Sequence, residues 1–509
     1  MSKIINVSKN DRTAFFSTVI CGLAIHMYKL TNTLPNGDSL YNFYHTQNIV
    51  SSGRWFLAVA CAPSSFFDLP WIEGLFSILY IALTAAIIVR LFDIRNRAVI
   101  AICGCLLVSL PGVTETFFYG FTSDGYFLAM LFSALAVYLS TRESKKAILL
   151  PLSALLVCLS CGIYQSYVSF ALILALLYFI FRAFDDKYTA RSAWRFVGEQ
   201  AIVFSSAMLL YYIIWRICMT LQGAVATDYL GISEIGLSGY TPKQAAHAFS
   251  GCIKNIKLAL IDFSRGQKPT LYSVLNMIFM LFLVAGISAA AIKTKLWRRK
   301  MPFIMTIAAL ICIIPFSCIW IFVSPDMVYR PMMLTCLGLV PIFTAVIFDR
   351  YAPARIGKVL TVFLAVMMIN NGLIANISYL YMEKCYERSY ATALEMTTRM
   401  HMMADDDEIS RIAVVGAGSR SAATALGADE PSARARVLTS HLQSDLLSDK
   451  YRVYYFFSNI LGVEFPFTSE EGCAALENDD AVRAMGVWPA RDSMVLRDGV
   501  LIIKIGECP

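Results

Sequence analysis

The first stretch of the chain that could carry out chemistry is residues 34–55, LPNGDSLYNFYHTQNIVSSGRW. Its polar and aromatic residues are Asp38, Tyr41, Phe43, Tyr44, His45, Arg54 and Trp55. A carboxylate can take the proton of an attacking hydroxyl, and arginine can hold a phosphate through two parallel hydrogen bonds. We therefore predict that this segment supplies a base and a phosphate-binding cation.

Residues of the same kind recur farther along the chain, each between two apolar segments. They are Asp68, Glu73, Glu115, Asp124, Tyr126, Tyr164, Gln165, Asp326 and Arg330. Charged side chains at membrane depth are costly and usually functional. A cavity built from these residues would hold a carboxylate base and a cation for a phosphate, which is the minimum for moving a glycosyl unit from a lipid phosphate.

Each of these residues also has a plain structural explanation. Asp38 follows Pro-Asn-Gly and could be a turn or cap residue, and Asp124 opens an apolar segment, where an N-cap is natural. Arg54 and Arg330 could extend to lipid headgroups, and Arg330 could pair with Asp326 at the surface. The surrounding tyrosines and tryptophan could form an interfacial belt, and the histidine could simply be solvated.

The composition shows which elements must position these residues. The chain of 509 residues is 57% hydrophobic and 16% charged, well below the roughly 25% charged of soluble domains. A bilayer core of about 30 Å needs roughly 20 apolar residues in a helix. Eleven segments meet this requirement: 13–31, 71–91, 98–114, 125–141, 147–161, 166–182, 199–219, 272–292, 301–323, 331–348 and 359–380. Residues 55–70 are too short and interrupted to span, and we expect an interfacial helix and turn there.

The charge pattern predicts the orientation of these spans. The uncharged stretch 147–181 is flanked on both sides by basic segments, so it must cross twice, with a turn near residues 161–165. Basic residues gather in alternate loops, and the loops that carry the candidate residues hold almost none. By the positive-inside rule the N-terminus is cytoplasmic and the C-terminal region lies outside. The net charge of +7 reports this orientation, and we expect no nucleic-acid partner.

The composition changes after residue 380, and we predict a membrane domain at 1–380 and a small α/β domain outside the membrane at 381–509. RIAVVG at 411–416 and YRVYYFF at 451–457 are predicted strands, and residues 494–505 a hairpin turning at Asp498-Gly499. VGAGS at 415–419 lacks full nucleotide-binding spacing, which favours a plain strand-to-helix turn.

The cysteines do not have metal-site spacing. The sequence has 14 cysteines, and most lie within apolar runs, where they act as small hydrophobic residues. No CxxC is followed by a second one, so we predict no zinc site. Cys473 and Cys508 fall in the expected outer compartment and could form a disulfide.

Three motifs resemble those of one known family, the type II Gtr glucosyltransferases. They are NGDSLYNFYHTQNIVSSGRW, FTSDGYFLAMLFSALAVYL at 121–139 and GIYQSYVSF at 162–170, together with the terminal MGVWPARDSMVLRDGVLIIKIG. The resemblance implies a GT-C-like polytopic enzyme of the bacterial inner membrane. It implies a donor of undecaprenyl-phosphate-linked sugar, usually glucose, and a lipid-linked O-antigen acceptor on the periplasmic side. Asp38 matches the family's first-loop acid and would be the base, and Asp124 matches the acid of the second loop.

The resulting hypothesis is a periplasm-facing hexosyl transferase. Asp38 is the predicted base, Asp124 a second acid, and Arg54 or Arg330 the phosphate clamp. The predicted substrate-binding residues are Tyr41, Tyr44, His45, Trp55, Tyr126, Tyr164, Gln165 and Asp326. A divalent cation remains open as a cofactor, and a flippase and a donor synthase are implied partners. The alternatives are a polyprenyl-linked saccharide flippase and an O-antigen polymerase.

Overall fold

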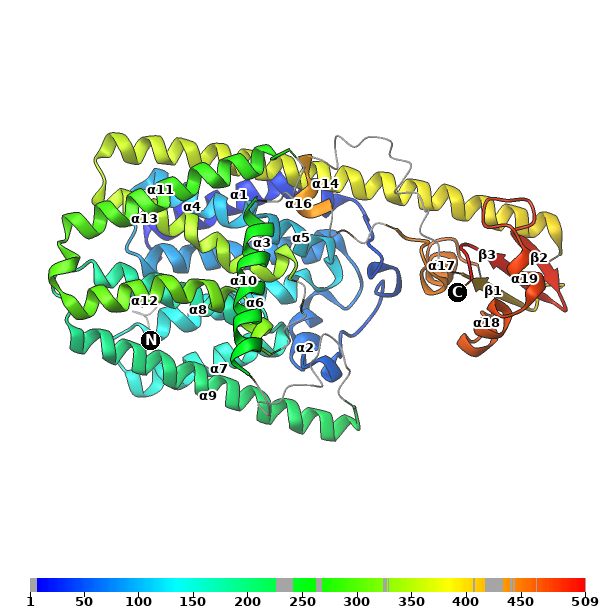
Figure 1. Ribbon diagram of the computed structural model, residues 1–509, viewed down its shortest axis with the longest axis horizontal. Coiled ribbons are helices and arrows are strands. Elements are labelled where there is room, and N and C mark those ends of the chain that lie inside the picture. The colour runs from blue at the N-terminus through cyan, green and yellow to red at the C-terminus, as the bar shows by residue number, and fades with distance from the viewer. Residues whose placement is uncertain are drawn as a thin grey trace. The chain divides into compact units, whose positions relative to one another are not determined.

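The computed structural model (Figure 1) describes residues 7–225, 241–261, 268–323, 327, 329–405, 408–416, 434–439, 442, 445–463 and 465–508. The chain forms two compact units. The first comprises residues 1–31, 46–376 and 434–438, and the second comprises 32–45, 377–433 and 439–509.

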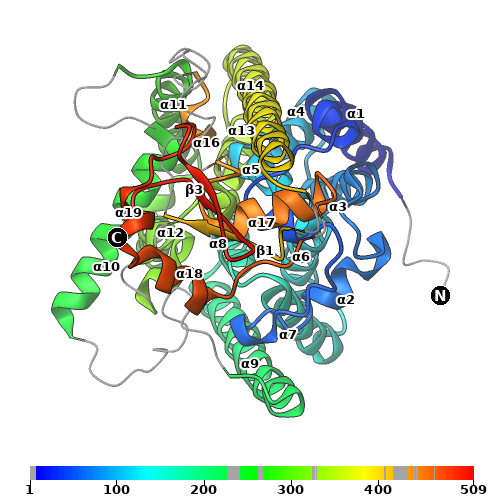
Figure 2. The ribbon, with the colours of Figure 1, turned by 90° about the vertical axis from the view of Figure 1, so that its right-hand side faces the viewer.

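The first unit is a bundle of apolar helices. They are α1 (Lys9–Thr31), α3 (Pro70–Leu91), α4 (Arg97–Ser109), α5 (Pro111–Phe118), α6 (Gly120–Ser140), α7 (Lys146–Ile163), α8 (Tyr167–Ala183), α9 (Ala190–Gln222), α11 (Leu271–Lys293), α12 (Lys300–Ser317), α13 (Leu339–Tyr351) and the first part of α14 (Ala354–Met403). Shorter elements are α2 (Leu57–Cys61), α10 (Pro242–Ile261) and the 3₁₀ helices η2 (Val50–Ser52), η3 (Ala62–Ser64), η5 (Leu296–Arg298), η6 (Ile319–Phe322) and η7 (Pro331–Gly338). Figure 2 views the bundle along its long helices.

Within the described residues, nine helices are long and apolar enough to cross a membrane, η7 and α13 counting together as one of them. The bent pair α4 and α5 would make a tenth, and α8 is an apolar helix just below the length required. All eleven predicted segments coincide with a helix or helix pair, and residues 55–70 form the short helices α2 and η3. The expectation of a polytopic helical protein with a small C-terminal sheet is confirmed.

Local sequence explains where these helices break. Pro111 is the first residue of α5, and the axis bends by 41° between α4 and α5, because proline has no N–H for the preceding turn and pushes the residue before it out of helical geometry. The uncharged stretch 147–181 divides after Ile163, where Tyr164 is extended. The observed break at 164–166 overlaps the turn predicted at 161–165.

The second unit contains a three-stranded sheet in the order β1-β3-β2. β1 (Arg411–Val415) is parallel to β3 (Val500–Lys504), and β2 (Met494–Arg497) pairs with β3 in antiparallel fashion. Asp498 and Gly499 both have positive φ, at 50° and 76°, which is the backbone of a two-residue Asp-Gly hairpin turn. The predicted strand at 411–416 and the hairpin are therefore confirmed. Residues 417–419 of the VGAGS segment lie outside the described residues.

The prediction of a strand at 451–457 is wrong. These residues form helix α17 (Lys450–Asn459), whose first turn is capped by the Asp449 side chain through the Arg452 N–H. Val453, Phe456 and Phe457 are buried, and their spacing of three and four residues puts them on one helical face. Aromatic residues favour strands in isolation, but here the buried face and the cap determine a helix.

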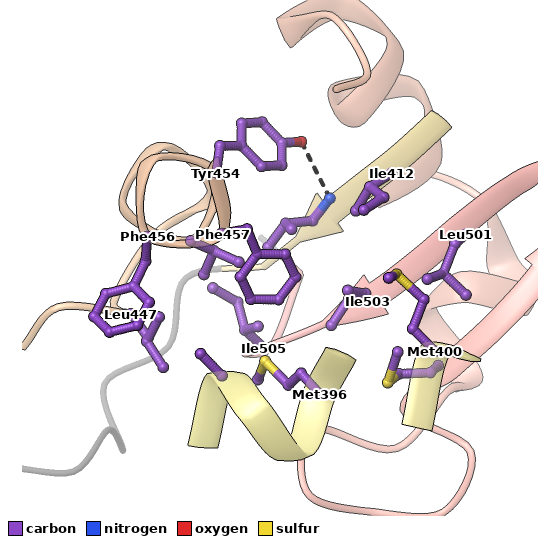
Figure 3. Packing of buried hydrophobic residues seen from close by; sticks show 14 of the residues in the cluster. Met396, Met400, Ile412, Leu447, Tyr454, Phe456, Phe457, Leu501, Ile503 and Ile505 are labelled. Carbon is purple, nitrogen blue, oxygen red and sulfur yellow. Dashed lines mark hydrogen bonds between the residues drawn. The ribbon is translucent and has the colours of Figure 1, made fainter. Parts of the chain in front are cut away.

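α17 packs against the sheet and the end of α14 to form the core of the second unit (Figure 3). The Tyr454 hydroxyl accepts a hydrogen bond from the Val414 N–H at 3.2 Å. Short helices α18 (Glu470–Glu477) and α19 (Asp480–Ala484) complete the unit. Cys473 and Cys508 share a second apolar cluster, but both thiols are free.

Candidate functional site

Most of the candidate residues in the first unit lie on or against one buried segment, residues 115–126, which we call the α5–α6 junction. α5 ends at Phe118, Tyr119 is non-helical, and α6 begins at Gly120. Glu115, Thr116, Ser123 and Asp124 on this segment are each at most 1% exposed. Buried polar groups are costly unless they have partners. The contacts of the junction therefore define the candidate site.

Asp124 does not cap α6, because the helix begins four residues earlier at Gly120. The N-cap alternative for this residue is therefore wrong. Its carboxylate accepts a hydrogen bond from the Gly125 N–H at 2.7 Å, and the side chains of Ser64 and Cys61 lie beside it. Cys61 ends α2 and Ser64 ends η3, so these two short helices lie against Asp124.

Arg54 lies against two tyrosines of the junction region. Its Nη1 donates to the Tyr126 hydroxyl at 3.2 Å, and its guanidinium carbon is 5.0 Å from the centre of the Tyr164 ring. The rings of Tyr126 and Tyr164 stack with centroids 4.5 Å apart. The contact with Tyr164 is a cation–π interaction, which holds the charge without neutralising it. These three predicted residues are brought together.

Gln165 and Trp55 have local structural contacts. Gln165 Nε2 donates to the Ser52 carbonyl oxygen at 2.7 Å, and its own backbone carbonyl accepts from Trp320 Nε1 at 3.0 Å. The Trp55 ring fills the space beside Gly162, where a Cβ would stand 2.7 Å from the ring. Both residues fix the loop that carries Arg54, and their contacts described above are with residues outside the junction.

Arg330 and Glu115 connect the junction to η7. Arg330 donates a hydrogen bond to the Tyr119 hydroxyl. Glu115 accepts the Met332 N–H through Oε2 at 2.6 Å, and its buried Oε1 has no hydrogen-bond partner within the described residues. These contacts hold the start of η7, and with it Arg330, against the end of α5. Asp326, the expected partner of Arg330, lies outside the described residues.

A buried charged group lies at the start of α6, and we call it the Lys29 group: Lys29, Asp68 and Glu73. Lys29 and Glu73 are 4% and 2% exposed. A Cβ on Gly120 would stand 3.1 Å from Asp68 Oδ1, 3.5 Å from Glu73 Oε2 and 4.0 Å from Lys29 Nζ. Glycine at position 120 therefore allows the three groups to meet against the helix.

The electrostatics of the Lys29 group are set by burial and by the opposite charges of its members. Burial is the largest effect and raises the pKa of the Asp68 carboxyl, whereas the charge of Lys29 opposes this rise. Sequence reasoning missed Lys29, since it treated residues 13–31 only as a span. A lysine next to the end of an apolar segment is the signal that could have found it.

Asp38, Tyr41, Tyr44 and His45 belong to the second unit. Asp38 is half-buried and accepts a hydrogen bond from the Tyr41 hydroxyl at 3.1 Å. It occupies the N-cap position of η1 (Ser39–Tyr41), but its side chain makes no cap bond. The Asn36 side chain accepts the N–H groups of Asp38 and Ser39 instead. Asp38 is thus not needed as a cap.

The remaining predicted residues of this segment are accessible. Tyr44 is 56% exposed, His45 is exposed, and the Tyr41 ring lies 5.5 Å from that of Tyr455 on α17. Leu40 is fully buried in the core of the second unit, and its carbonyl oxygen accepts from Asn459 at 2.7 Å. Leu40 and Asn459 therefore anchor the segment, whereas Tyr44 and His45 are exposed.

No three His, Cys, Asp or Glu side chains converge as metal ligands within the described parts of the chain. The use of a divalent cation as a cofactor therefore stays open, as in the sequence analysis.

Comparison with known proteins identifies one family. The family model described as glucosyl transferase GtrII matches residues 27–347. This range covers more than half of the chain, and it contains Arg54, Asp124 and Arg330 and the segment of Asp38. No curated protein and no solved structure matches the chain.

Proposed function

The chain belongs to the GtrII glucosyl transferase family, and from this premise we propose that it transfers glucose from undecaprenyl phosphate to a lipid-linked O-antigen. We place the reaction on the periplasmic face of the bacterial inner membrane, with the N-terminus in the cytoplasm and the C-terminal unit in the periplasm. The proposed partners are a flippase that delivers the donor and a synthase that makes it.

The observation that carries this proposal is the α5–α6 junction, where Asp124, Arg54 and Arg330 lie with the rings of Tyr119, Tyr126 and Tyr164. Arg54 and Arg330 each donate a hydrogen bond to a tyrosine hydroxyl, and these neutral contacts orient the guanidinium groups without neutralising their charge. Stacked aromatic rings such as Tyr126 and Tyr164 offer a flat apolar face with a polar rim. A sugar phosphate matches both features, because its phosphate is an anion and its sugar ring has an apolar face with hydroxyl groups at the rim.

The proposed reaction is a displacement at the anomeric carbon of glucose. An acceptor hydroxyl attacks this carbon, the new C–O bond forms, and the bond to the phosphate oxygen breaks. The hydroxyl proton passes to the base, which we propose is Asp38, and the polyprenyl phosphate leaves with the electron pair. Arg54 or Arg330 stabilises the additional negative charge that develops on the phosphate, where fixed cations are most effective. Asp124 orients the acceptor.

The rival function is transport of a polyprenyl-linked saccharide. A flippase needs polar groups through the depth of the bilayer, whereas the candidate acids and arginines come from segments predicted to lie at one face. The proposed function therefore predicts formation of a new glycosidic bond, which transport does not produce.

The test measures transfer of labelled glucose from polyprenyl phosphate to O-antigen in membranes containing the wild-type protein or Asp38→Asn or Asp124→Asn. We expect near-complete loss with Asp38→Asn and a large decrease with Asp124→Asn. Asp93→Asn is the matched control, because this acid is an exposed residue paired with Arg95. Full activity of Asp38→Asn at normal expression would remove Asp38 as the base. Absence of transfer by the wild type with any hexose donor would favour a transporter.

A further inference from the structure

The first unit contains an apolar cavity of about 250 Å³ beside η7. Side chains of several helices line it, among them Leu106, Ile256, Phe279, Leu310, Phe343 and Met367. Its few polar neighbours include Tyr272 and Asn276, which donate hydrogen bonds to the Ala259 and Leu260 carbonyl oxygens at 2.8 and 3.0 Å. Because those groups are satisfied, the cavity favours an apolar ligand.

α10 forms one wall of this cavity and has two unlike faces. Ala248 and Cys252 are buried and Ile256, Ala259 and Leu260 line the cavity, whereas Lys243, His247, Lys254 and Lys257 are exposed. α10 is not among the candidate spans, and it crosses the long helices of the first unit (Figures 1 and 2). A basic amphipathic helix in this orientation is typical of the membrane–water interface, where anionic headgroups gather.

The cavity lies next to the proposed phosphate clamp. Pro331 and Gly112 line it, and they are neighbours in sequence of Arg330 and of the α5 turn that carries Glu115. The position of a Gly112 Cβ would be only 2.4 Å from the Pro331 carbonyl oxygen. α10 reaches the same place, because Asn255 Oδ1 accepts the Tyr329 N–H at 3.3 Å.

We propose that this cavity binds the phosphate-proximal isoprene units of the donor lipid, with the phosphate at Arg330 and α10 as the cover. The inference rests on the proposed function and adds the site of the lipid chain to it. An apolar cavity of about 150 Å³ is large enough for the six carbons of benzene, so the present one, of about 250 Å³, holds about two five-carbon isoprene units and leaves the rest of the chain in the bilayer. Preference for a donor that carries an isoprenoid chain follows from this arrangement.

A second apolar cavity, of about 480 Å³, lies between α8, α9 and α12. Its lining includes Ala201, Phe204 and Ala308 and contains no charged residue. It is larger, but none of its lining residues adjoins Arg330 or Arg54 in sequence. This second cavity is therefore the matched control rather than the proposed site.

The experiment compares Ala259→Phe, which fills the proposed cavity, with Ala308→Phe, which makes the same change in the control cavity. The donors are glucosyl phosphates of full-length polyprenol and, as the short donor, of methanol, which has no isoprene unit to place in the cavity. Each buried CH₂ changes binding about fourfold, so displacing two or three carbons should raise the KM for the long-chain donor about 15- to 60-fold. We expect Ala259→Phe to leave the KM for the short donor unchanged, and Ala308→Phe to change neither.

The outcomes separate this inference from the proposed function. The cavity assignment would be overturned if Ala259→Phe raised the KM for both donors equally, or if only Ala308→Phe raised the KM for the long-chain donor. In either case, transfer by the wild type would still support the proposed function. Lack of transfer from either donor by the wild type would overturn both. Should Ala259→Phe fail to fold, a photoreactive polyprenyl phosphate added to the wild type decides the question. Labelling on α10 or α11 supports the proposal, and labelling confined to α9 contradicts it.

Discussion

Replacing Lys29 by methionine should destabilise the first unit far more than removing all the charges of the Lys29 group together. Two carboxyl groups that share one buried site do not both ionise readily, so we assign one negative charge to the pair of Asp68 and Glu73. The ammonium group of Lys29 balances that charge in a site where it is only 4% exposed. In Lys29→Met a net negative charge remains buried.

The structure sets the size of this effect. Lys29 Nζ and one oxygen of each carboxyl lie within 4.0 Å of the Gly120 Cβ position. The separations between Nζ and these oxygens are therefore below about 8 Å, where two unit charges at an effective dielectric constant of about 20 attract by about 2 kcal/mol. Removing one partner of a buried ion pair costs about 3–5 kcal/mol, because the remaining charge is also desolvated. We expect Lys29→Met to lie in that range.

The assay is the free energy of unfolding of the purified protein, measured by denaturant titration in detergent. The triple variant Lys29→Met, Asp68→Asn, Glu73→Gln should recover most of the loss, since neutral side chains of similar volume replace a buried ion group at little cost. Lys9→Met is the matched control at the exposed start of the same helix. A loss below about 1 kcal/mol in Lys29→Met, typical of exposed pairs, would refute the reasoning. A triple variant as unstable as the single one would refute it too.

Three further predictions concern other parts of the protein. Arg330→Gln should lower kcat for glucose transfer about 100- to 1,000-fold at normal expression, as loss of one fixed donor to a developing charge does; a change below about threefold would exclude the clamp role. Gly112→Ala should lower the free energy of unfolding by about 1–3 kcal/mol, because its Cβ would stand 2.4 Å from the Pro331 carbonyl oxygen. An unchanged melting temperature would show that η7 can shift to make room. The hydrogen bond from Arg497 lowers the pKa of Asp479, so its stabilisation is complete above the ordinary pKa of aspartate and is lost as pH falls through the lowered one. Hydrogen exchange of β2 should show this acid sensitivity in the wild type and not in Asp479→Asn.

The helices of the bundle could be predicted because their apolar length decides them. At 1.5 Å per residue, a stretch such as 147–181 is too long for one crossing, and basic flanks require an even number. The Asp498-Gly499 hairpin was equally clear, since few other dipeptides adopt two positive φ angles so readily. Both signals lie within a few residues and need no tertiary information.

The same local approach failed where distant residues decide the outcome. Residues 451–457 have the aromatic composition of a strand, yet burial of Val453, Phe456 and Phe457 on one face makes them helical. Leu40 has no local feature that predicts packing with α17, although it is fully buried there. Because of this contact, residues 32–45 belong to the second unit while Arg54, only a few residues later, belongs to the first. Composition cannot reveal such a division.

The two aspartates expected to carry the chemistry illustrate why roles are harder to predict than positions. Both looked like capping residues in the sequence, and neither caps a helix in the structure. Asp124 accepts the Gly125 N–H, and the side chains of Ser64 and Cys61 lie beside its carboxylate, so its position is fixed while part of its acceptor capacity remains for a substrate hydroxyl. Asp38 is half-buried, and within the described residues its carboxylate accepts only the hydroxyl of its neighbour Tyr41. The carboxylate with open lone pairs suits proton transfer, and the one whose position is fixed suits orientation of the acceptor. The residues that distinguish Asp124 from Asp38 are Cys61 on α2 and Ser64 on η3, about sixty positions before Asp124. A local motif around either aspartate therefore cannot reveal which role each one has.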